Sequence, residues 1–312
     1  MSNILKNSTA TVKLNTGATI PLLGLGTWRS TEEEAYNAVL SAIKDGYRHI
    51  DSAAIYGNEA PVGRAIRDSG VPREELFVTT KLWGTQHRDP KFALQESLKR
   101  LGLDYVDLYL MHWPVALKTA NIKDGNYLTF PIAPNGKRDV DLDDWNFIKT
   151  WELLQELPAT GKTKAVGVSN FSVNNLKDLL ASPTTKVVPA ANQVELHPYL
   201  PQEELVKFCE GKGIVIEAYS PLGSNGSPLL KDPVVIKIAE KYGVEPAQVL
   251  INWGLKRGYV ILPKSVTPSR IASNFKVFEL SDEDFEKINN ISKENGIKRF
   301  VDPDWEGFET FV

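Results

Sequence analysis

The stretch Gly46-Tyr-Arg-His-Ile-Asp-Ser-Ala-Ala-Ile-Tyr56 decides how this chain folds. From Tyr47 to Asp51 the residues alternate in character with a period of two, which predicts a β-strand that ends at Asp51. Residues 52–57 are expected to form a loop that leads into a helix. The carboxylate of Asp51 and the phenol of Tyr56 should therefore face one pocket.

Similar strand and helix units follow along the chain. Predicted strands cover residues 24–27, 47–51, 76–81, 105–112, 163–168, 190–196, 214–219 and 259–262, and helices separate them. The strand at 163 comes late because an insertion, about residues 114–144, interrupts the repeat. Eight continuous β-branched strands that alternate with helices favour a closed α/β barrel of parallel strands, the (β/α)8 TIM barrel.

Three further segments complete the predicted architecture. A β-hairpin at about residues 11–22 comes first, and an aromatic tail at about residues 295–312 is expected to cover the barrel mouth. Ser30 and Glu33 predict a helix capping box, and Trp145 is expected to lie within a helix. Because no low-complexity linker divides the chain, we expect residues 1–312 to form a single domain.

A dinucleotide-binding Rossmann fold is the alternative that Gly24 and Gly26 suggest. The third position of that glycine fingerprint holds Arg29, and the usual helix start is displaced. The barrel is therefore the better interpretation.

The composition limits the classes of partner. Hydrophobic residues make up 42% of the chain and charged residues 24%, as in soluble globular proteins. With a net charge of -3 and no basic run, no nucleic acid or anionic membrane partner is expected. The single cysteine, Cys209, is expected to be a buried, inert thiol in a helix. No leader or membrane-spanning segment is evident, so we expect a cytoplasmic monomer.

The chemistry follows from the strand ends, where functional side chains of such barrels collect. Lys81 and His112 end two further predicted strands. A phenol has a pKa of about 10, and the ammonium of Lys81 should make Tyr56 a stronger acid while Asp51 keeps Lys81 charged. His112 can orient a substrate carbonyl. Because protonation of a carbonyl oxygen needs a matching hydride, which no side chain supplies, a nicotinamide cofactor is implied.

Each of these residues also has a simpler explanation. An Asp51–Lys81 pair at strand ends can be purely structural, and His112 beside Trp113 can be an ordinary core histidine. Their occurrence together at three strand ends favours the catalytic interpretation.

Longer motifs point to a family. They are Gly46-Tyr-Arg-His-Ile-Asp51, Tyr56-Gly-Asn-Glu59, Leu101-Gly-Leu-Asp-Tyr-Val-Asp-Leu-Tyr109, His112-Trp-Pro114, Gly167-Val-Ser-Asn-Phe171, Asn192-Gln-Val-Glu-Leu-His-Pro198 and Leu262-Pro-Lys-Ser265. From the hairpin to the tail, the chain resembles the aldo-keto reductases, particularly fungal cytosolic members. The resemblance implies a reversible, NADP(H)-dependent reduction of aldehydes and ketones to alcohols, with Tyr56 as proton donor and no metal.

The resemblance also implies a set of cofactor contacts. These are Thr27, Trp28, Asp51, Ser169, Asn170, Gln193, Tyr219, Ser220, Pro221, Leu222, Gly223, Ser224, Lys264, Ser265, Val266, Thr267, Arg270 and Asn274. Ser169, Asn170 and Gln193 match the positions that hold the nicotinamide carboxamide. Tyr219 matches the aromatic residue that stacks on the ring, and residues 220–224 match the loop over the pyrophosphate.

Two cations favour NADPH over NADH. Lys264 and Arg270 match an adenosine 2′-phosphate site, where cations, hydroxyls and backbone donors near a helix start suit a dianion. Ser273 stands where relatives often carry Glu or Gln towards the adenine, so the resemblance leaves the adenine contact and the strength of the preference open.

An aromatic substrate site is expected at the barrel mouth. Its predicted residues are Trp28, Tyr56, Trp83, His112, Trp113 and Trp305. An aromatic bowl with few charges favours small apolar aldehydes and ketones. The insertion and the tail should decide which of these are substrates.

Two other functions fit parts of the pattern. A barrel that binds NADPH as a sensor or regulatory subunit would show little turnover. A sugar-phosphate isomerase or aldolase barrel would instead use Lys81 to form a Schiff base.

Overall fold

Eight parallel strands form the centre of the computed structural model, which describes residues 5–224 and 226–312. Residues 1–4, where no leader segment is expected, lie outside this description. In sheet order the strands are β4 (Leu25–Gly26), β5 (His49–Asp51), β6 (Phe77–Leu82), β7 (Val106–Met111), β8 (Thr163–Ser169), β9 (Ala191–Glu195), β10 (Val215–Tyr219) and β11 (Val260–Leu262).

The sheet closes between its first and last strands. The backbone N–H of Gly24 donates to the carbonyl of Ile261 at 3.0 Å, and the N–H of Ile261 donates to Leu22 at 2.7 Å. The predicted TIM barrel is confirmed, and the Rossmann alternative is wrong. Gly24 serves strand packing, because a Cβ there would lie 2.8 Å from the ring of His49 and 2.9 Å from Leu262.

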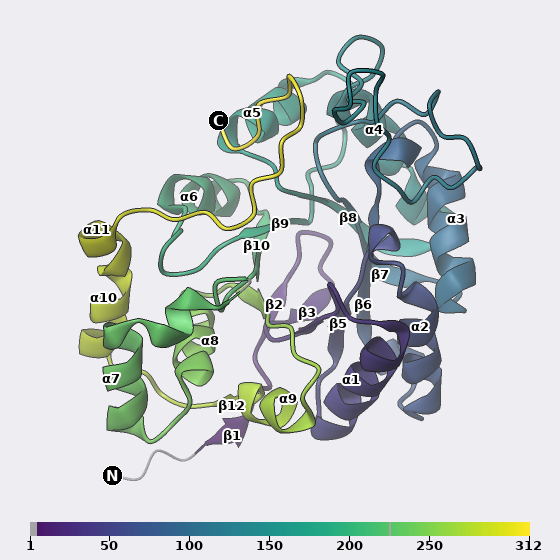
Figure 1. Cartoon of the computed structure of the whole chain (residues 1–312). Coiled ribbons are helices and arrows are strands. Elements are labelled where there is room, and N and C mark those ends of the chain that lie inside the picture. The colour runs from purple at the N-terminus through teal and green to yellow at the C-terminus, as the bar shows by residue number, and fades with distance from the viewer. Residues whose placement is uncertain (1–4, 225) are drawn as a thin grey trace.

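Helices surround the barrel (Figure 1). They are α1 (Glu32–Asp45), α2 (Glu59–Asp68), α3 (Pro90–Leu101), α4 (Phe147–Leu154), α5 (Val173–Ala181), α6 (Glu203–Gly211), α7 (Pro233–Tyr242), α8 (Pro246–Lys256), α9 (Pro268–Asn274), α10 (Asp282–Asn289) and α11 (Ile291–Asn295). The predicted capping box at Ser30 and Glu33 is wrong by one residue, since Thr31 and Glu34 form it. Trp145 precedes α4 instead of lying in a helix.

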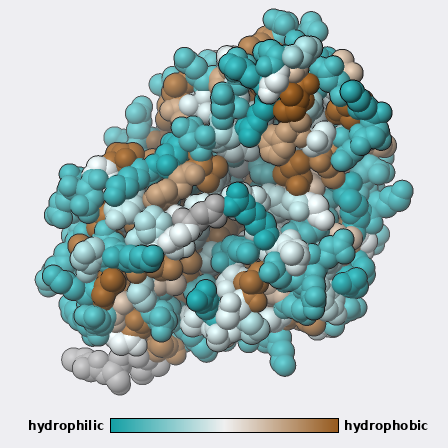
Figure 2. Space-filling model, viewed as in Figure 1, coloured by the Kyte–Doolittle hydropathy of each residue, from teal (hydrophilic) through white to brown (hydrophobic). Residues whose placement is uncertain are grey.

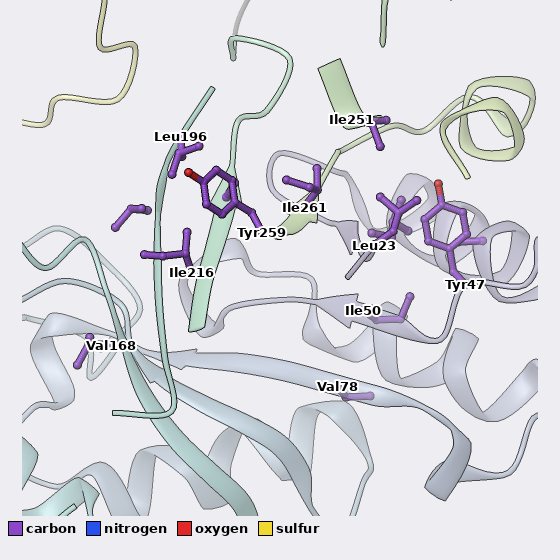
Figure 3. Close-up of a cluster of buried hydrophobic side chains, with 14 of the residues drawn as sticks. Leu23, Tyr47, Ile50, Val78, Val168, Leu196, Ile216, Ile251, Tyr259 and Ile261 are labelled. Atoms are coloured by element: carbon purple, nitrogen blue, oxygen red, sulfur yellow. The ribbon is translucent and has the colours of Figure 1, made fainter. Parts of the chain in front are cut away.

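The main core lies between strands and helices. Figure 3 shows part of it, with Ile216 on β10, Ile261 on β11 and Ile251 on α8 among the buried side chains. Cys209 is buried in α6 as a free thiol, as predicted, and burial raises its pKa to about 12. It is therefore a neutral apolar group near neutral pH.

A hairpin closes one end of the barrel. Strands β2 (Thr11–Lys13) and β3 (Thr19–Pro21) pair antiparallel, as the sequence predicted. Leu14 and Ile20 from this hairpin pack with Leu108 and other strand residues in a second buried cluster. Because the hairpin covers one end of the barrel, the open end is the one at which the strands have their carboxyl ends.

The sequence did not reveal the pairing of β1 (Lys6–Asn7) with β12 (Lys276–Val277), because strands of two residues carry no readable period. The yellow chain that follows α11 crosses the molecule towards α5 (Figure 1). We call residues 296–312 the tail and residues 114–144 the insertion loop. Among the helices of the described residues, none is long and apolar enough to cross a membrane.

Candidate active site

A cavity of about 800 Å³ opens at the carboxyl ends of the strands. Figure 2, viewed as in Figure 1, shows this face hollowed, with hydrophobic residues along part of the rim. Residues from the strand ends, the insertion loop and the tail line it. A concave, mostly apolar site with a few polar groups is typical of small-molecule binding.

A buried ion pair lies beneath this cavity. The Lys81 amine on β6 donates to Asp51 Oδ2 at 2.7 Å and to the carbonyl of Ser52 at 2.7 Å. Lys81 is fully buried and does not line the cavity. Burial is the largest single influence and lowers the pKa of Lys81, but Asp51, Tyr56 and Glu217 together outweigh it and raise that pKa above 10.5. Lys81 is therefore a fixed cation.

Tyr56 lies between this pair and the cavity. It ends a short 3₁₀ helix after β5, and its hydroxyl is 3.5 Å from the Lys81 amine. Burial raises the pKa of Tyr56 above 10, while Lys81 acts in the opposite direction and Asp51 adds to the rise. Lys81 lowers the pKa of Tyr56, as expected. Burial raises that pKa by more, so the net pKa of Tyr56 is above 10.

His112 follows β7 and faces Tyr56. The two ring centroids are 5.7 Å apart in a T-shaped arrangement, and His112 packs against Trp83 in the same way at 5.6 Å. Burial, followed by the charge of Lys81, holds the pKa of His112 well below 6.5. A neutral imidazole is a hydrogen-bonding group here and carries no charge.

Gln193 links Asp51 to a second carboxyl group that the sequence did not reveal. Its Nε2 donates to Asp51 Oδ1 at 2.8 Å and to Glu217 Oε2 at 3.0 Å. Glu217 is fully buried, and burial together with Asp51 raises its pKa to about 8. Two carboxyl groups that share one amide favour a proton on one of them, and Asp51 is the one paired with Lys81.

This buried acid predicts a pH-dependent stability difference. Since the folded pKa of Glu217 is above its unfolded value of about 4.3, its stabilising contribution is full below pH 4.3 and is lost as pH rises to about 8. We expect Glu217→Gln, which cannot ionise, to gain melting temperature relative to wild type across this window. The gain should level off above pH 8. Thermal melts of both proteins, with exposed Glu203→Gln as control, measure it; a constant difference across pH contradicts the expectation.

Aromatic side chains form one wall of the cavity. Trp83, Trp113 and Trp305 are buried in one cluster, and the Trp113 and Trp305 ring centroids are 5.4 Å apart. Trp28 also lines the cavity but is 39% exposed at its rim. The structure thus brings all six predicted substrate residues, Trp28, Tyr56, Trp83, His112, Trp113 and Trp305, to this cavity.

The other wall contains strained backbone. Of the seven non-glycine residues with left-handed φ in the described chain, five line the cavity: Arg29, Asn170, Ser220, Ser224 and Ser227. Such conformations cost about 1–3 kcal/mol each and cluster at ligand sites. The hydroxyl of Tyr219 donates to Asn170 Oδ1 at 2.6 Å, which fixes both side chains at the cavity edge. Polar amides, an aromatic face and a serine-rich loop suit a nicotinamide nucleotide.

The predicted cofactor residues fall into two groups. Those at the cavity are Thr27, Trp28, Asp51, Ser169, Asn170, Gln193, Tyr219, Ser220, Pro221, Leu222, Ser224 and Lys264. Those that do not line it are Gly223, Ser265, Val266, Thr267, Arg270 and Asn274. Lys264 and Arg270 are exposed, and neither has an ion-pair partner among the described residues. Two exposed cations, of which Lys264 lines the cavity, suit the phosphate groups of a nucleotide.

Comparison with known proteins identifies the chain. The model of the aldo/keto reductase family matches residues 22–293. The chain belongs to the aldo/keto reductase family. Part of the matched span supplies the strand ends that surround the cavity.

Individual relatives agree with this membership over most or all of their length. The chain is 66% identical over 311 residues to a glycerol 2-dehydrogenase (NADP(+)) of Saccharomyces cerevisiae and 65% identical to an aldehyde reductase (YPR1) of the same organism, covering 100% of both chains in each case. A D-galacturonate reductase of Hypocrea jecorina is 48% identical, with 93% of this chain and 94% of the relative covered. The aldose reductase structure from Schistosoma japonicum matches with a TM-score of 0.85 and 38% identity over 94% of each chain.

The cavity of this aldo/keto reductase also includes residues that the sequence did not single out. Phe130 and Arg138 come from the insertion loop, and Arg138 lies 4.6 Å above the ring of Trp305. Phe300 and Val301 come from the tail. The only sequence signal for these four residues was their position in the predicted insertion and tail. Among the described residues no group of His, Cys, Asp and Glu could hold a metal ion.

Proposed function

We propose that this chain is an NADP(H)-dependent reductase of aldehydes and ketones. The observation that carries the proposal is a half-buried phenol, Tyr56, at the floor of an aromatic cavity, 3.5 Å from the buried cation Lys81. The names of the two yeast relatives, an aldehyde reductase and an NADP(+) glycerol dehydrogenase, support the same reaction class.

In this proposal Tyr56 gives its proton to the carbonyl oxygen of the substrate. Lys81 stabilises the phenolate that remains, because opposite charges attract strongly where water is excluded. Asp51 keeps Lys81 charged, and the Ser52 carbonyl fixes the direction of the amine. Tyr56, Lys81 and Asp51 thus act together in the transfer of one proton.

His112 orients the substrate. Being neutral, its imidazole can donate a hydrogen bond to the carbonyl oxygen without competing with Tyr56 as the charged acid. The rings of Trp83 and Trp113 exclude water and hold an apolar substrate against this pair.

The bound NADPH supplies the hydride that the carbonyl carbon requires. Ser169, Asn170 and Gln193 are the proposed partners of its carboxamide. Gln193 suits this role because both hydrogens of its amide are used by carboxyl groups, which leaves Oε1 free to accept.

Selectivity for NADPH is assigned to Lys264 and Arg270. We expect Arg270→Gln to weaken NADPH binding roughly tenfold to a hundredfold, because a hydrogen bond to a charged group contributes about 1.5–3 kcal/mol. NADH affinity should stay close to wild type, since NADH lacks the 2′-phosphate. Fluorescence titration with both nucleotides measures this, and exposed Lys237→Gln is the matched control. Equal weakening of both nucleotides refutes the assignment.

The competing functions can be separated from this one. A Schiff-base barrel needs an accessible neutral amine, whereas Lys81 is fully buried, charged and held by two oxygen acceptors. A sensor barrel would bind NADPH without turning over. Mixing the protein with NADPH and an aromatic aldehyde separates these cases. Loss of the reduced-nicotinamide absorbance is the expected result, and a flat trace would refute the enzyme.

The cellular setting is part of the proposal. We infer that the whole chain acts as a single-domain, cytoplasmic monomer without nucleic acid or membrane partners. The net charge of -3 favours this inference, since it gives no reason to expect a polyanionic partner. Light scattering of the purified protein tests the monomer.

A further inference from the structure

One buried carboxylate of the barrel binds two backbone amides of the tail. Glu195 is the last residue of β9 and is fully buried. Its Oε1 accepts the backbone N–H of Phe300 at 2.7 Å, and its Oε2 accepts that of Val301 at 2.8 Å. His197 Nε2 lies 2.8 Å from the same Oε1. One carboxylate thus holds two consecutive amides that lie more than 100 residues further along the chain.

This attachment point is directly next to the cavity wall. Phe300, Val301 and Trp305 all line the cavity, and Trp305 is 3% exposed against Trp113. Only a few residues of irregular chain separate Phe300 and Val301 from Trp305. A shift of the backbone at Phe300 and Val301 would therefore change the cavity wall that these two residues line.

The backbone N–H of Lys298 in the tail also donates to the carbonyl of Tyr199 at 2.9 Å. Two polar contacts further along the tail are weaker. Lys137 pairs with Glu306 at 2.8 Å, but both side chains are well exposed. Arg138 donates to the Asp304 carbonyl at 3.1 Å, also at the surface. Exposed pairs contribute about 0–1 kcal/mol, whereas a buried carboxylate that loses its partners is strongly destabilising. The contacts of Glu195 are therefore a stronger restraint than these two exposed ones.

We propose that Glu195 is a specificity-determining positioning residue, which sets the substrate wall by fixing the start of the tail through the amides of Phe300 and Val301. Glu195 does not line the cavity, so it acts on the substrate only through the tail. The inference rests on the proposed reductase function for its kinetic consequence, but the attachment itself can be measured without turnover.

The test is hydrogen exchange on the intact protein. In wild type, the amides of Phe300 and Val301 should exchange much more slowly than those of Asp302 and Asp304, which donate to no described residue. In Glu195→Gln, which retains one acceptor oxygen, exchange at both positions should be at least about tenfold faster. Exposed Glu203→Gln, which removes a charge from α6, should leave the tail unchanged.

Kinetics give the second readout. For a bulky aromatic aldehyde, Glu195→Gln should raise KM severalfold while kcat changes little, because the proton donor and its ion pair are untouched. For a small aliphatic aldehyde, the KM change should be smaller, since that substrate makes fewer contacts with Trp305. NADPH affinity should remain at the wild-type value.

The outcomes are distinguishable. Fast exchange of Phe300 and Val301 in wild type, or unchanged exchange in Glu195→Gln, overturns the attachment. Faster exchange without a difference between the two aldehydes overturns the role in specificity. Absence of turnover in wild type refutes the reductase while leaving the exchange result valid. If Glu195→Gln does not fold, His197→Gln, which removes one of the partners of Glu195, is used, with the same direction of change expected.

Discussion

Replacing Tyr56 with Phe is expected to lower kcat by about 10²–10⁴-fold, the usual contribution of a positioned general acid. The ring remains, so its T-shaped contact with His112 is retained and only the hydroxyl 3.5 Å from Lys81 is lost. NADPH affinity should stay near the wild-type value, because the hydroxyl is not one of the proposed carboxamide partners. Steady-state turnover and nucleotide titration of the same preparation measure the two quantities separately.

A matched control is available for this substitution. Tyr36→Phe also removes a hydroxyl, one that donates to Asp68 at 2.8 Å on the surface. It should leave turnover unchanged. If Tyr56→Phe retained the wild-type rate, Tyr56 would not be the acid, and the proposed mechanism would fail.

Replacing Lys81 with Met is expected to damage both activity and stability. Asp51 would be left buried without its cation, which typically costs about 3–5 kcal/mol of folding free energy. The hydroxyl of Tyr56 would lose the ammonium that lowers its pKa, while burial and Asp51 would still raise it. Turnover should therefore fall by about 10²-fold or more, the lower end of the contribution of a positioned general acid.

A second substitution separates these two effects. Combining Lys81→Met with Asp51→Asn removes the unpaired charge, so most of the lost stability should return, as chemical denaturation would show. Activity should not return, because the phenol still lacks its cation. Recovery of turnover in the double variant would mean that Lys81 acts only by balancing Asp51.

If the double variant is as stable as wild type, a remaining loss of turnover cannot come from unfolding. Gln193 donates to Asp51 through its amide, and an asparagine at position 51 can still accept there. A double variant that is stable, inactive and normal in NADPH affinity would therefore assign the Lys81–Asp51 pair to the proton step.

The sequence alone carried a large part of the fold. The period-two pattern around Asp51 and the repeated alternation with helices predicted the barrel, because burial of a strand on both faces imposes a pattern that is local in the chain. The strand ends then placed Asp51, Lys81 and His112 at one edge. Errors such as the capping box at Ser30 were shifts of one residue, where two adjacent hydroxyl residues compete for the same cap.

Other features depended on contacts between distant segments. Glu217 carries no local signal, since its raised pKa arises only when the barrel brings Asp51 and Gln193 beside it. The same is true of Glu195, whose partners lie in the tail. Phe130 and Arg138 join the aromatic wall because an irregular loop folds back over the mouth.

The sequence thus determined the barrel, the family and the identity of the residues proposed for proton transfer, because strand periodicity and motifs at strand ends are written in consecutive residues. Only the tertiary structure decided the state of those residues and the walls around them. Desolvation depends on everything packed around a group, as the raised pKa of Tyr56 shows despite Lys81 beside it. The position of a residue in the chain does not reveal which groups will pack around it.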